Sequence, residues 1–367
     1  MNTKIRNILS VVLLLGFVLI FAVWGVLKPD DLISDRERRP LAGRPELTLS
    51  GLKNGSYMTK YETYSADQFP LRDGFSQLKI FVALDLFGQK DVNGFYSAQG
   101  HAAQLDYPLN EASVDNAAKK FSYIYDRYLS DKNAKVYISV IPDKNSFLAE
   151  PNGYPAFDFA ELTSLLRSCT DSFSEYIEIG DTLSLESFYR TDAHWRQETL
   201  LPTAGRIADA LGADIEADYT PRLLDSPLRG VYSGKTDLSI DTEPLYYLDS
   251  AVFSACRVYD FETDSFLPVY DLEKAAGRDA YELFLSGSKS LLRIENPTSG
   301  NDRRLIIFRD SFGSSLAPLL VPGYSEVTLV DVWYIASARL ESLIDFDNAD
   351  VLFRYSTGVL NNSETLK

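Results

Sequence analysis

The sequence is poor in side chains that bind metals. Among its 367 residues are two histidines, His101 and His194, and two cysteines, Cys169 and Cys256. The cysteines lack the spacing and the neighbouring ligands of a zinc site, so we expect no metal. One disulfide would suit an exported protein, but we favour two buried free thiols. The sequence also lacks a glycine-rich phosphate loop, a heptad run and an internal repeat, and we expect no cofactor.

Positive charge is in short supply as well. The chain has 36 Lys and Arg against 52 Asp and Glu, which gives a formal net charge of −16 and a pI of about 4.6. This excess of negative charge excludes a nucleic-acid partner and electrostatic binding to anionic lipid. An acidic surface also repels polyanionic polymers, so a neutral or locally cationic glycan is the easier partner.

One stretch has no charge at all. Residues 8–27 are mostly Leu, Val, Ile and Phe, and twenty such residues just span a bilayer core of about 30 Å. Lys4 and Arg6 precede the stretch, which predicts a cytoplasmic N-terminus. A cleaved signal peptide is the alternative, but its apolar region would be shorter, and we favour an uncleaved anchor. The predicted organisation is a cytoplasmic tail (1–7), a membrane anchor (8–27), a juxtamembrane linker (28–50) and an extracytoplasmic domain (51–367).

Beyond the linker, helical and strand patterns alternate, which predicts a mainly parallel sheet with helices on its faces. A composition of 45% hydrophobic and 24% charged residues supplies enough apolar material for a core. Residues 220–280 are less regular, and we interpret them as an inserted subdomain with short strands at 252–253 and 257–259. The predicted helices are 114–128, 157–173, 197–211 and 335–344, and the predicted strands are 135–141, 176–179, 326–330 and 351–355.

A short apolar strand, residues 304–308, leads directly into Asp310 and Ser311. A helical run from Leu316 to Leu320 follows and ends at Pro322. A serine at such a strand-to-helix turn faces the positive end of the next helix, where an acyl-transfer nucleophile would be placed. The alternative is that Ser311 merely caps the helix.

A serine nucleophile needs an imidazole to take its proton and a carboxylate to orient that imidazole. Asp192 and His194 are two residues apart, so on an extended segment their side chains point the same way. We therefore predict a Ser311–His194–Asp192 triad. His101 has no acidic or serine neighbour in the sequence, and we expect it to be structural or surface-exposed.

These motifs resemble the DHHW family, which is similar to the AlgX and AlgJ alginate O-acetyltransferases and related to the SGNH hydrolases. The resemblance rests on the order of an Asp-x-His-Trp motif before an Asp-Ser motif, with Ala193 at the position of the second family histidine. Further blocks agree with it: Ser34–Ala42, Asp67–Asp73, Ile141–Asn145 and the segment from Tyr281 to Asn296. Arg309 stands where the SGNH block has glycine.

The resemblance implies an SGNH-hydrolase-like three-layer α/β/α fold with a mainly parallel sheet, beside the N-terminal transmembrane helix and the inserted subdomain. It also implies acetyl transfer to a cell-surface or exported polysaccharide through an acetyl-serine. Relatives of this kind work with a membrane acyltransferase of the MBOAT type, which would donate the acetyl group. An extracytoplasmic carbohydrate acetylesterase and a non-catalytic glycan-binding or scaffold subunit stay open as alternatives.

Four further residues are candidate substrate-binding residues because they flank the predicted catalytic groups or follow a strand end. Lys144 follows the strand 135–141 and could contact an oxyanion or a substrate, although a solvated turn lysine explains it equally well. The other three are Trp195, Arg309 and Asp310. The sequence leaves open the polysaccharide, the oligomeric state and the oxyanion-hole residues beyond the Ser311 region.

Overall fold

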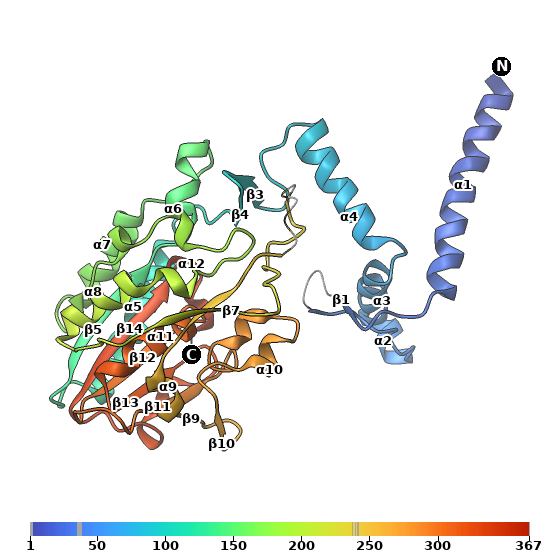
Figure 1. The fold of residues 1–367 in the computed structure, drawn as a ribbon. Coiled ribbons are helices and arrows are strands. Elements are labelled where there is room, and N and C mark those ends of the chain that lie inside the picture. Colours follow the sequence, from blue (N-terminus) through green and yellow to red (C-terminus); the bar gives the residue numbers. More distant parts are fainter. Residues whose placement is uncertain (1–2, 35–38, 237, 239, 241, 367) are drawn as a thin grey trace. The chain divides into compact units, whose positions relative to one another are not determined.

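The computed structural model describes residues 3–34, 39–236, 238, 240 and 242–366. The chain divides into two compact units, Met1–Val92 and Asn93–Lys367 (Figure 1). Parts of three predicted segments lie outside the described residues: residues 1–2 of the cytoplasmic tail, residues 35–38 of the linker, and residues 237, 239 and 241 of the inserted subdomain.

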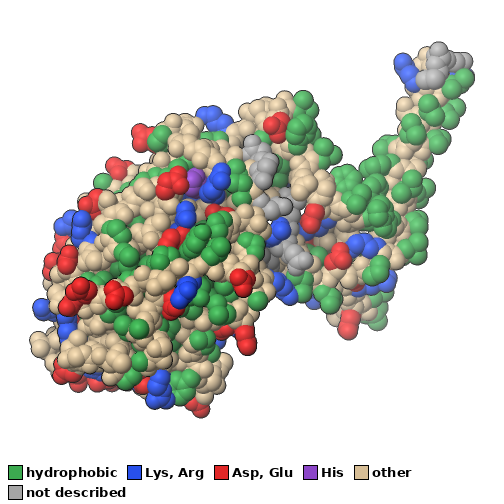
Figure 2. All heavy atoms as spheres, in the orientation of Figure 1, with side chains coloured by type: hydrophobic (Ala, Val, Ile, Leu, Met, Phe, Trp, Pro, Cys, Tyr) green, Lys and Arg blue, Asp and Glu red, His purple; other side chains and the backbone are tan. Residues whose placement is uncertain are grey.

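The N-terminal unit begins with helix α1, Thr3–Leu27, which contains the predicted apolar span. Its mean hydropathy over 18 residues reaches 2.8, so it is long and apolar enough to cross a membrane. Figure 2 shows hydrophobic side chains along most of this helix. A signal sequence has the same properties, so the choice between an anchor and a cleaved leader stays a prediction.

The rest of this unit is mostly helical, with a break at Phe69-Pro70. Proline lacks the backbone N–H that continues a helix, and Leu71 after it adopts a left-handed conformation with φ of 58°. The elements are strands β1 (Ile33–Ser34) and β2 (Arg39–Pro40), helices α2 (Leu49–Lys53), α3 (Ser56–Asp67) and α4 (Arg72–Phe81), and a π-helical turn at Val82–Leu86.

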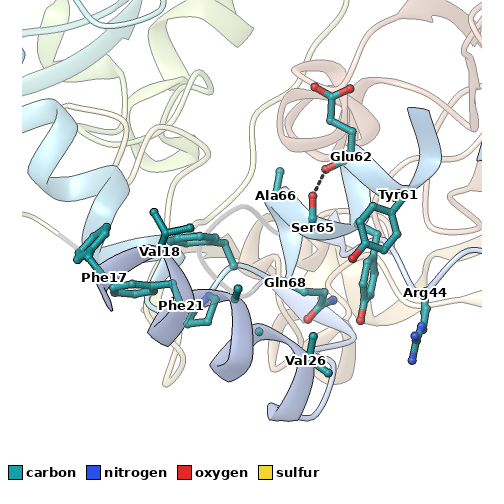
Figure 3. Close-up of a pocket in the computed structure, with 15 residues that line it drawn as sticks. Phe17, Val18, Phe21, Val26, Arg44, Tyr61, Glu62, Ser65, Ala66 and Gln68 are labelled. Carbon is teal, nitrogen blue, oxygen red and sulfur yellow. Dashed lines mark hydrogen bonds between the residues drawn. The ribbon is translucent and has the colours of Figure 1, made fainter. Parts of the chain in front are cut away.

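A pocket of about 610 Å³ lies within the N-terminal unit (Figure 3). Phe17 and Phe21 of α1 form an apolar wall, and Tyr61, Ser65 and Gln68 bring polar groups from α3 and its end. The Ser65 hydroxyl donates a hydrogen bond to the Glu62 carbonyl oxygen at 3.0 Å. None of the predicted catalytic residues lines this pocket.

Asp67 at the end of α3 ties the linker to the helices. Its carboxylate accepts hydrogen bonds from the Arg39 guanidinium at 2.6 and 2.9 Å and from the backbone N–H of Ala42 at 2.9 Å. The hydrogen bond from Arg39 lowers the pKa of Asp67 to about 2, and the Ala42 N–H acts in the same direction against the opposing effect of burial. The backbone near Arg39 and Ala42 is thereby tied to the end of α3.

We expect the Asp67 contact to stabilise the N-terminal unit above about pH 4 and to be lost as the pH falls towards 2. The pKa is lower in the folded than in the unfolded chain, so folding favours the ionised carboxylate. Asp67→Asn should therefore speed proteolysis of the linker at pH 7, with the difference from wild type shrinking between about pH 4 and pH 2. Acid-stable pepsin would serve at the low pH values. The exposed Asp85→Asn is the matched control, and equal proteolysis of both variants at pH 7 would contradict the expectation.

The C-terminal unit is built on an eight-stranded sheet with the strand order β10-β9-β11-β13-β12-β14-β5-β6. The strands from β13 to β6 pair in parallel, whereas β11, β9 and β10 continue the sheet in antiparallel fashion. The strands are β5 (Lys135–Ile141), β6 (Glu175–Tyr176), β9 (Arg257–Asp260), β10 (Ser265–Leu267), β11 (Leu291–Glu295), β12 (Arg304–Arg309), β13 (Glu326–Val330) and β14 (Ala349–Ser356). The prediction of a large, mostly parallel sheet is confirmed.

Helices pack on both faces of this sheet (Figure 1). On one face, α5 (Glu111–Tyr128) and α7 (Phe159–Thr170) bury residues such as Phe121 and Leu166 against alternate residues of the strands. On the other face, α8 (Leu201–Leu211) and α11 (Gly313–Leu320) bury residues such as Ile207 and Leu316. Buried strands between two helical layers need apolar residues on both sides, which explains the near-continuous apolar runs of β12 and β14.

Shorter elements complete the unit. The hairpin of β3 (Phe95–Ala98) and β4 (His101–Gln104) comes first in the chain, and β7 (Thr220–Leu223) pairs with β8 (Tyr246–Asp249). The remaining α-helices are α6 (Asn145–Leu148), α9 (Ala251–Ala255), α10 (Leu272–Ala275) and α12 (Thr357–Leu360).

Several local predictions are wrong. Residues 252–253 lie in helix α9, not in a strand, and β9 and β10 extend the main sheet rather than forming a subdomain of their own. Residues 337–342 form a 3-10 helix where an α-helix over 335–344 was expected. Strand β6 is only two residues long where a strand over 176–179 was expected, and a 3-10 helix follows at Gly180–Thr182. Both cysteines are free, but Cys169 is exposed.

Candidate active site

Ser311 lies in the turn between β12 and α11, as predicted from the sequence. Asp310 before it is buried and bonds in two directions, accepting from the Phe312 N–H at 3.1 Å and from the Ser356 N–H at the end of β14 at 2.7 Å. A Cβ on Gly313 would come within 2.7 Å of the Arg309 Cβ, so the helix can start this close to the strand only with glycine. The turn is thus fixed to the carboxyl ends of two neighbouring strands.

Asp192 and His194 lie in a tight loop closed at its base by hydrogen bonds between neighbouring chain segments. The Tyr189 N–H donates to the His194 carbonyl at 3.1 Å, and the Arg196 N–H donates to the Ser187 carbonyl at 2.8 Å. The segment from Thr191 to His194 is bent, not extended as the sequence argument assumed. The two side chains still meet, because the Asp192 carboxylate also accepts the backbone N–H of His194 at 3.0 Å.

The structure brings Asp192, His194 and Ser311 together. The Ser311 Oγ lies 2.7 Å from the His194 Nε2, and the His194 Nδ1 lies 2.7 Å from the Asp192 Oδ1. The second Asp192 oxygen accepts the Val231 N–H at 2.8 Å. Asp192 is 1% exposed and the His194 side chain 16%, so the carboxylate is sequestered while the imidazole edge stays reachable. This arrangement can activate a serine hydroxyl for attack on an ester carbonyl.

Two residues that sequence reasoning missed shape the loop around Asp192. Glu243 accepts hydrogen bonds from the backbone N–H of Arg190 and Thr191, each at 2.8 Å, and from the Thr191 hydroxyl at 2.6 Å. A Cβ on Gly230 would lie only 2.0 Å from the Thr191 carbonyl oxygen, so the two segments can approach this closely only with glycine. Glu243 and Gly230 lie in no recognisable sequence motif, so the sequence alone could not identify them.

The imidazole is packed on one side by an aromatic ring. Tyr281 stacks on His194 with 4.0 Å between ring centroids and 17° between planes. The Tyr281 hydroxyl lies 2.8 Å from the Ser315 Oγ, which also accepts the Trp195 indole N–H at 2.9 Å. Burial raises the pKa of Tyr281 well above its usual value, so this phenol stays neutral. Tyr281 belongs to a block used for the family resemblance, but its spacing gave no sign of this role.

Lys144 is buried, and its amine is occupied by backbone carbonyls. The Nζ donates to Ala102 at 2.9 Å and to Tyr189 at 2.6 Å, at the base of the Asp192 loop. Burial lowers the pKa of Lys144 to about 8, although the neighbouring Asp192 and Glu243 act in the opposite direction. The structure therefore shows Lys144 holding the loop, and its contact with substrate stays a prediction.

The other candidate substrate-binding residues are also buried. Trp195 and Arg309 are 0% exposed, and Asp310 is 8% exposed with both oxygens bonded to backbone. The Arg309 guanidinium donates to the carbonyl oxygens of Asp310 and Lys289, each at 3.3 Å. All three contact protein groups around the nucleophile turn, and a role in substrate binding stays a prediction.

A second buried arginine was not anticipated. Arg354 on β14 is fully buried, lies 4.4 Å from the centroid of the Trp195 ring, and has no hydrogen-bond partner for its nitrogens among the described residues. Burial lowers the pKa of Arg354 to about 9, against the attraction of Asp310. A charged residue between the apolar residues Phe353 and Tyr355 was the signal in the sequence.

The start of α11 offers fewer free donors than the sequence argument assumed. The N–H groups of Phe312, Gly313 and Ser314 are bonded to the Asp310 side chain, the Asp310 carbonyl and the Ser311 carbonyl. The backbone N–H of Ser311 itself bonds no described residue, which makes it the candidate oxyanion donor. His101 is not part of the triad: it is buried in β4, with its Nδ1 3.3 Å from the Gln99 carbonyl oxygen.

No protein-family profile matches the chain, and no curated protein sequence is significantly similar to it. The structure of the chain is, however, similar to solved structures of other proteins. A DHHW family protein from Eubacterium siraeum shares 20% identity and a TM-score of 0.62, over 75% of this chain and 95% of that one. Bacillus cereus PatB1 shares 17% identity and a TM-score of 0.60, over 76% of this chain and 99% of that one, and has also been solved with a sulfonyl adduct.

The O-acetyltransferase domain of Pseudomonas putida AlgJ aligns with 68% of the chain at a TM-score of 0.42, too low for a structural argument. The other two proteins share 20% and 17% identity with the chain, and similarity at this level indicates a shared fold. The resemblance to the DHHW family seen in the sequence is therefore confirmed at the level of the fold.

Proposed function

We propose that this chain is an O-acetyltransferase acting on an extracytoplasmic polysaccharide, with an SGNH-hydrolase-like catalytic unit. The observation that carries the proposal is the alignment of Ser311, His194 and Asp192 through two contacts of 2.7 Å. The shared fold with a DHHW family protein and with PatB1 supports it.

In the first half-reaction, His194 takes the proton of Ser311 as the hydroxyl attacks the acetyl carbonyl. The bond between Oγ and the carbonyl carbon forms, the ester bond of the donor breaks, and the leaving oxygen receives the proton from His194. Asp192 holds the imidazole in the tautomer with its proton on Nδ1 and stabilises the imidazolium that forms. The product is acetyl-Ser311.

In the second half-reaction, His194 removes a proton from an acceptor hydroxyl, which attacks the acetyl group. The bond to Oγ breaks, and Ser311 regains a proton from His194. A sugar hydroxyl gives transfer and water gives hydrolysis, so access to the acetyl-enzyme separates a transferase from an esterase. The proposal places α1 in the membrane and an MBOAT-type acyltransferase beside it as the acetyl donor.

Intact-mass spectrometry of the full-length chain in detergent tests this proposal. With an activated aryl acetate as donor, wild type should gain one acetyl group, located at Ser311 by peptide mapping, and Ser311→Ala should gain none. A glycan acceptor should speed loss of the acetyl group from the enzyme and acquire it. Because PatB1 carries a sulfonyl adduct in one structure, a sulfonyl fluoride offers a second label for Ser311.

The outcomes separate the candidate functions. An acetyl-enzyme that persists in water and is discharged by glycan supports a transferase. Rapid acetate release without accumulation indicates an acetylesterase. Absence of any serine-dependent adduct with either reagent would reject the triad and leave a binding or scaffold subunit.

A further inference from the structure

A second cavity lies in the C-terminal unit and has a polar lining. Its volume is about 690 Å³, in the range of pockets that bind small ligands. Polar side chains come from four separate chain segments, so the cavity is a feature of the tertiary structure. The polar residues that matter here are Gln104, Asp106, Asn110, Asp143, Tyr232 and Asn361.

Two segments connect this cavity to the triad. The Tyr232 N–H donates to the Thr191 carbonyl at 2.8 Å, and its neighbour Val231 donates to the Asp192 carboxylate. On another side, Gly358 lies two residues after Ser356, whose N–H is bonded to Asp310. Two residues span at most about 7 Å, so the cavity lies beside the segments that hold Asp192 and Asp310, although no triad residue lines it.

The cavity presents hydrogen-bonding groups beside an aromatic side chain. Asp106 accepts the Asn361 amide at 2.6 Å through one oxygen, while its other oxygen is buried without a hydrogen-bond partner among the described residues. Tyr232 lines the same space. Carboxylates, amides and an aromatic ring are the groups that bind the hydroxyls and the apolar face of a sugar.

Two acidic side chains, Asp106 and Asp143, also line the cavity. Within the described part of the chain, neither Asp106 nor Asp143 forms a salt bridge, and the amine of the adjacent Lys144 is directed to backbone carbonyls. Burial, with Asp106 adding to it, raises the pKa of Asp143 to about 6, and burial also raises the pKa of Asp106. The two carboxyl groups in the lining oppose a third carboxylate and favour a neutral or amine-bearing ligand.

We propose that this cavity is the acceptor subsite, and that it admits neutral or amino-sugar residues and rejects uronic acids. The proposal rests on the proposed function for its place in the reaction, but binding itself needs no catalysis. It assigns specificity to Asp106 and Asp143, whose charges a uronate carboxylate would meet. The acceptor of this chain is therefore a polysaccharide other than a polyuronate.

Calorimetric titration of the full-length chain carrying Ser311→Ala provides the test, because this variant cannot be acetylated. The probes are three β-1,4-linked tetramers that differ in one group: glucose, glucosamine and glucuronate. We expect the glucuronate tetramer to bind at least about 10-fold more weakly than the other two at pH 7.5.

Two changes in the cavity make the test specific. Asp106→Asn combined with Asp143→Asn removes both charges and keeps one acceptor oxygen at each position, and should bring the three affinities within about 3-fold of one another. Gly358→Leu should weaken all three by at least about 10-fold, because a Cβ there meets nothing within 4 Å and the side chain can extend into the cavity. The exposed Asp126→Asn on α5 is the charge-matched control and should change none of them.

Equal binding of the glucuronate tetramer, no binding of any tetramer, or affinities unchanged in the cavity variants would each overturn the proposal. Thermal unfolding of each variant verifies that the chain is folded. Failure of the proposed function would be seen elsewhere, as the lack of acetyl-Ser311 in wild type, and the two results are independent.

Discussion

Replacing Asp192 with Asn should lower the rate of Ser311 acetylation by about 10³- to 10⁴-fold. In the structure, every contact of the Asp192 oxygens that we describe is with a donor: the backbone N–H of His194, the His194 ring and the Val231 N–H. Asparagine has one acceptor oxygen and one NH₂ group. If its NH₂ faces the ring, the imidazole must carry its proton on Nε2 and cannot accept the proton of Ser311.

The rate is measured from the accumulation of the acetyl adduct by mass spectrometry at fixed donor concentration. Asp126→Asn, the same chemical change at an exposed site of α5, should leave the rate within about 2-fold of wild type. A loss below about 10-fold in Asp192→Asn, in a folded variant, would mean that the carboxylate does not set the tautomer of His194.

The second large effect is expected from Gly230→Ala, a residue that takes no part in the chemistry. The added Cβ would lie 2.0 Å from the Thr191 carbonyl oxygen and 2.1 Å from its carbon, which are backbone atoms that cannot rotate away. Thr191 adjoins Asp192, so the loop must shift by an ångström or more. A misplacement of that size costs about 10²-fold in rate.

Gly205→Ala in helix α8 is the matched control, because a Cβ there meets nothing within 4 Å. Alanine is the better helix former, so this variant should keep full activity and gain up to about 1 kcal/mol in free energy of unfolding. Acetylation rate and thermal unfolding are measured for both variants. Wild-type acetylation by Gly230→Ala would show that the loop tolerates the shift.

The sequence predicted the arrangement of Ser311, His194 and Asp192 because each depends on local patterns. Ser311 follows a strongly apolar strand and precedes a helix, and this strand-to-helix turn is as expected. The spacing of Asp192 and His194 indicated a pair even though the segment is bent rather than extended. Scarcity of histidine then left little choice of candidate general base.

The surrounding residues could not be predicted, since their roles depend on contacts between distant segments. Glu243 reaches Thr191 across 52 positions, and Tyr281 stacks on His194 from a separate segment. Gly230 is required only because another backbone passes against it. Similarly, the parallel strands followed from apolar runs, whereas the β9–β10 hairpin joined the same sheet through the pairing of β9 with β11, which no local pattern contains.

Both edges of the large sheet are formed by its short strands. At one edge β6 has two residues, and at the other β10 has three, with the Phe266 ring covered by the Arg257 guanidinium at 4.2 Å. A strand this short exposes too few backbone donors and acceptors to template another chain. Many copies of this protein crowded on one surface would therefore resist edge-to-edge pairing through β6 or β10.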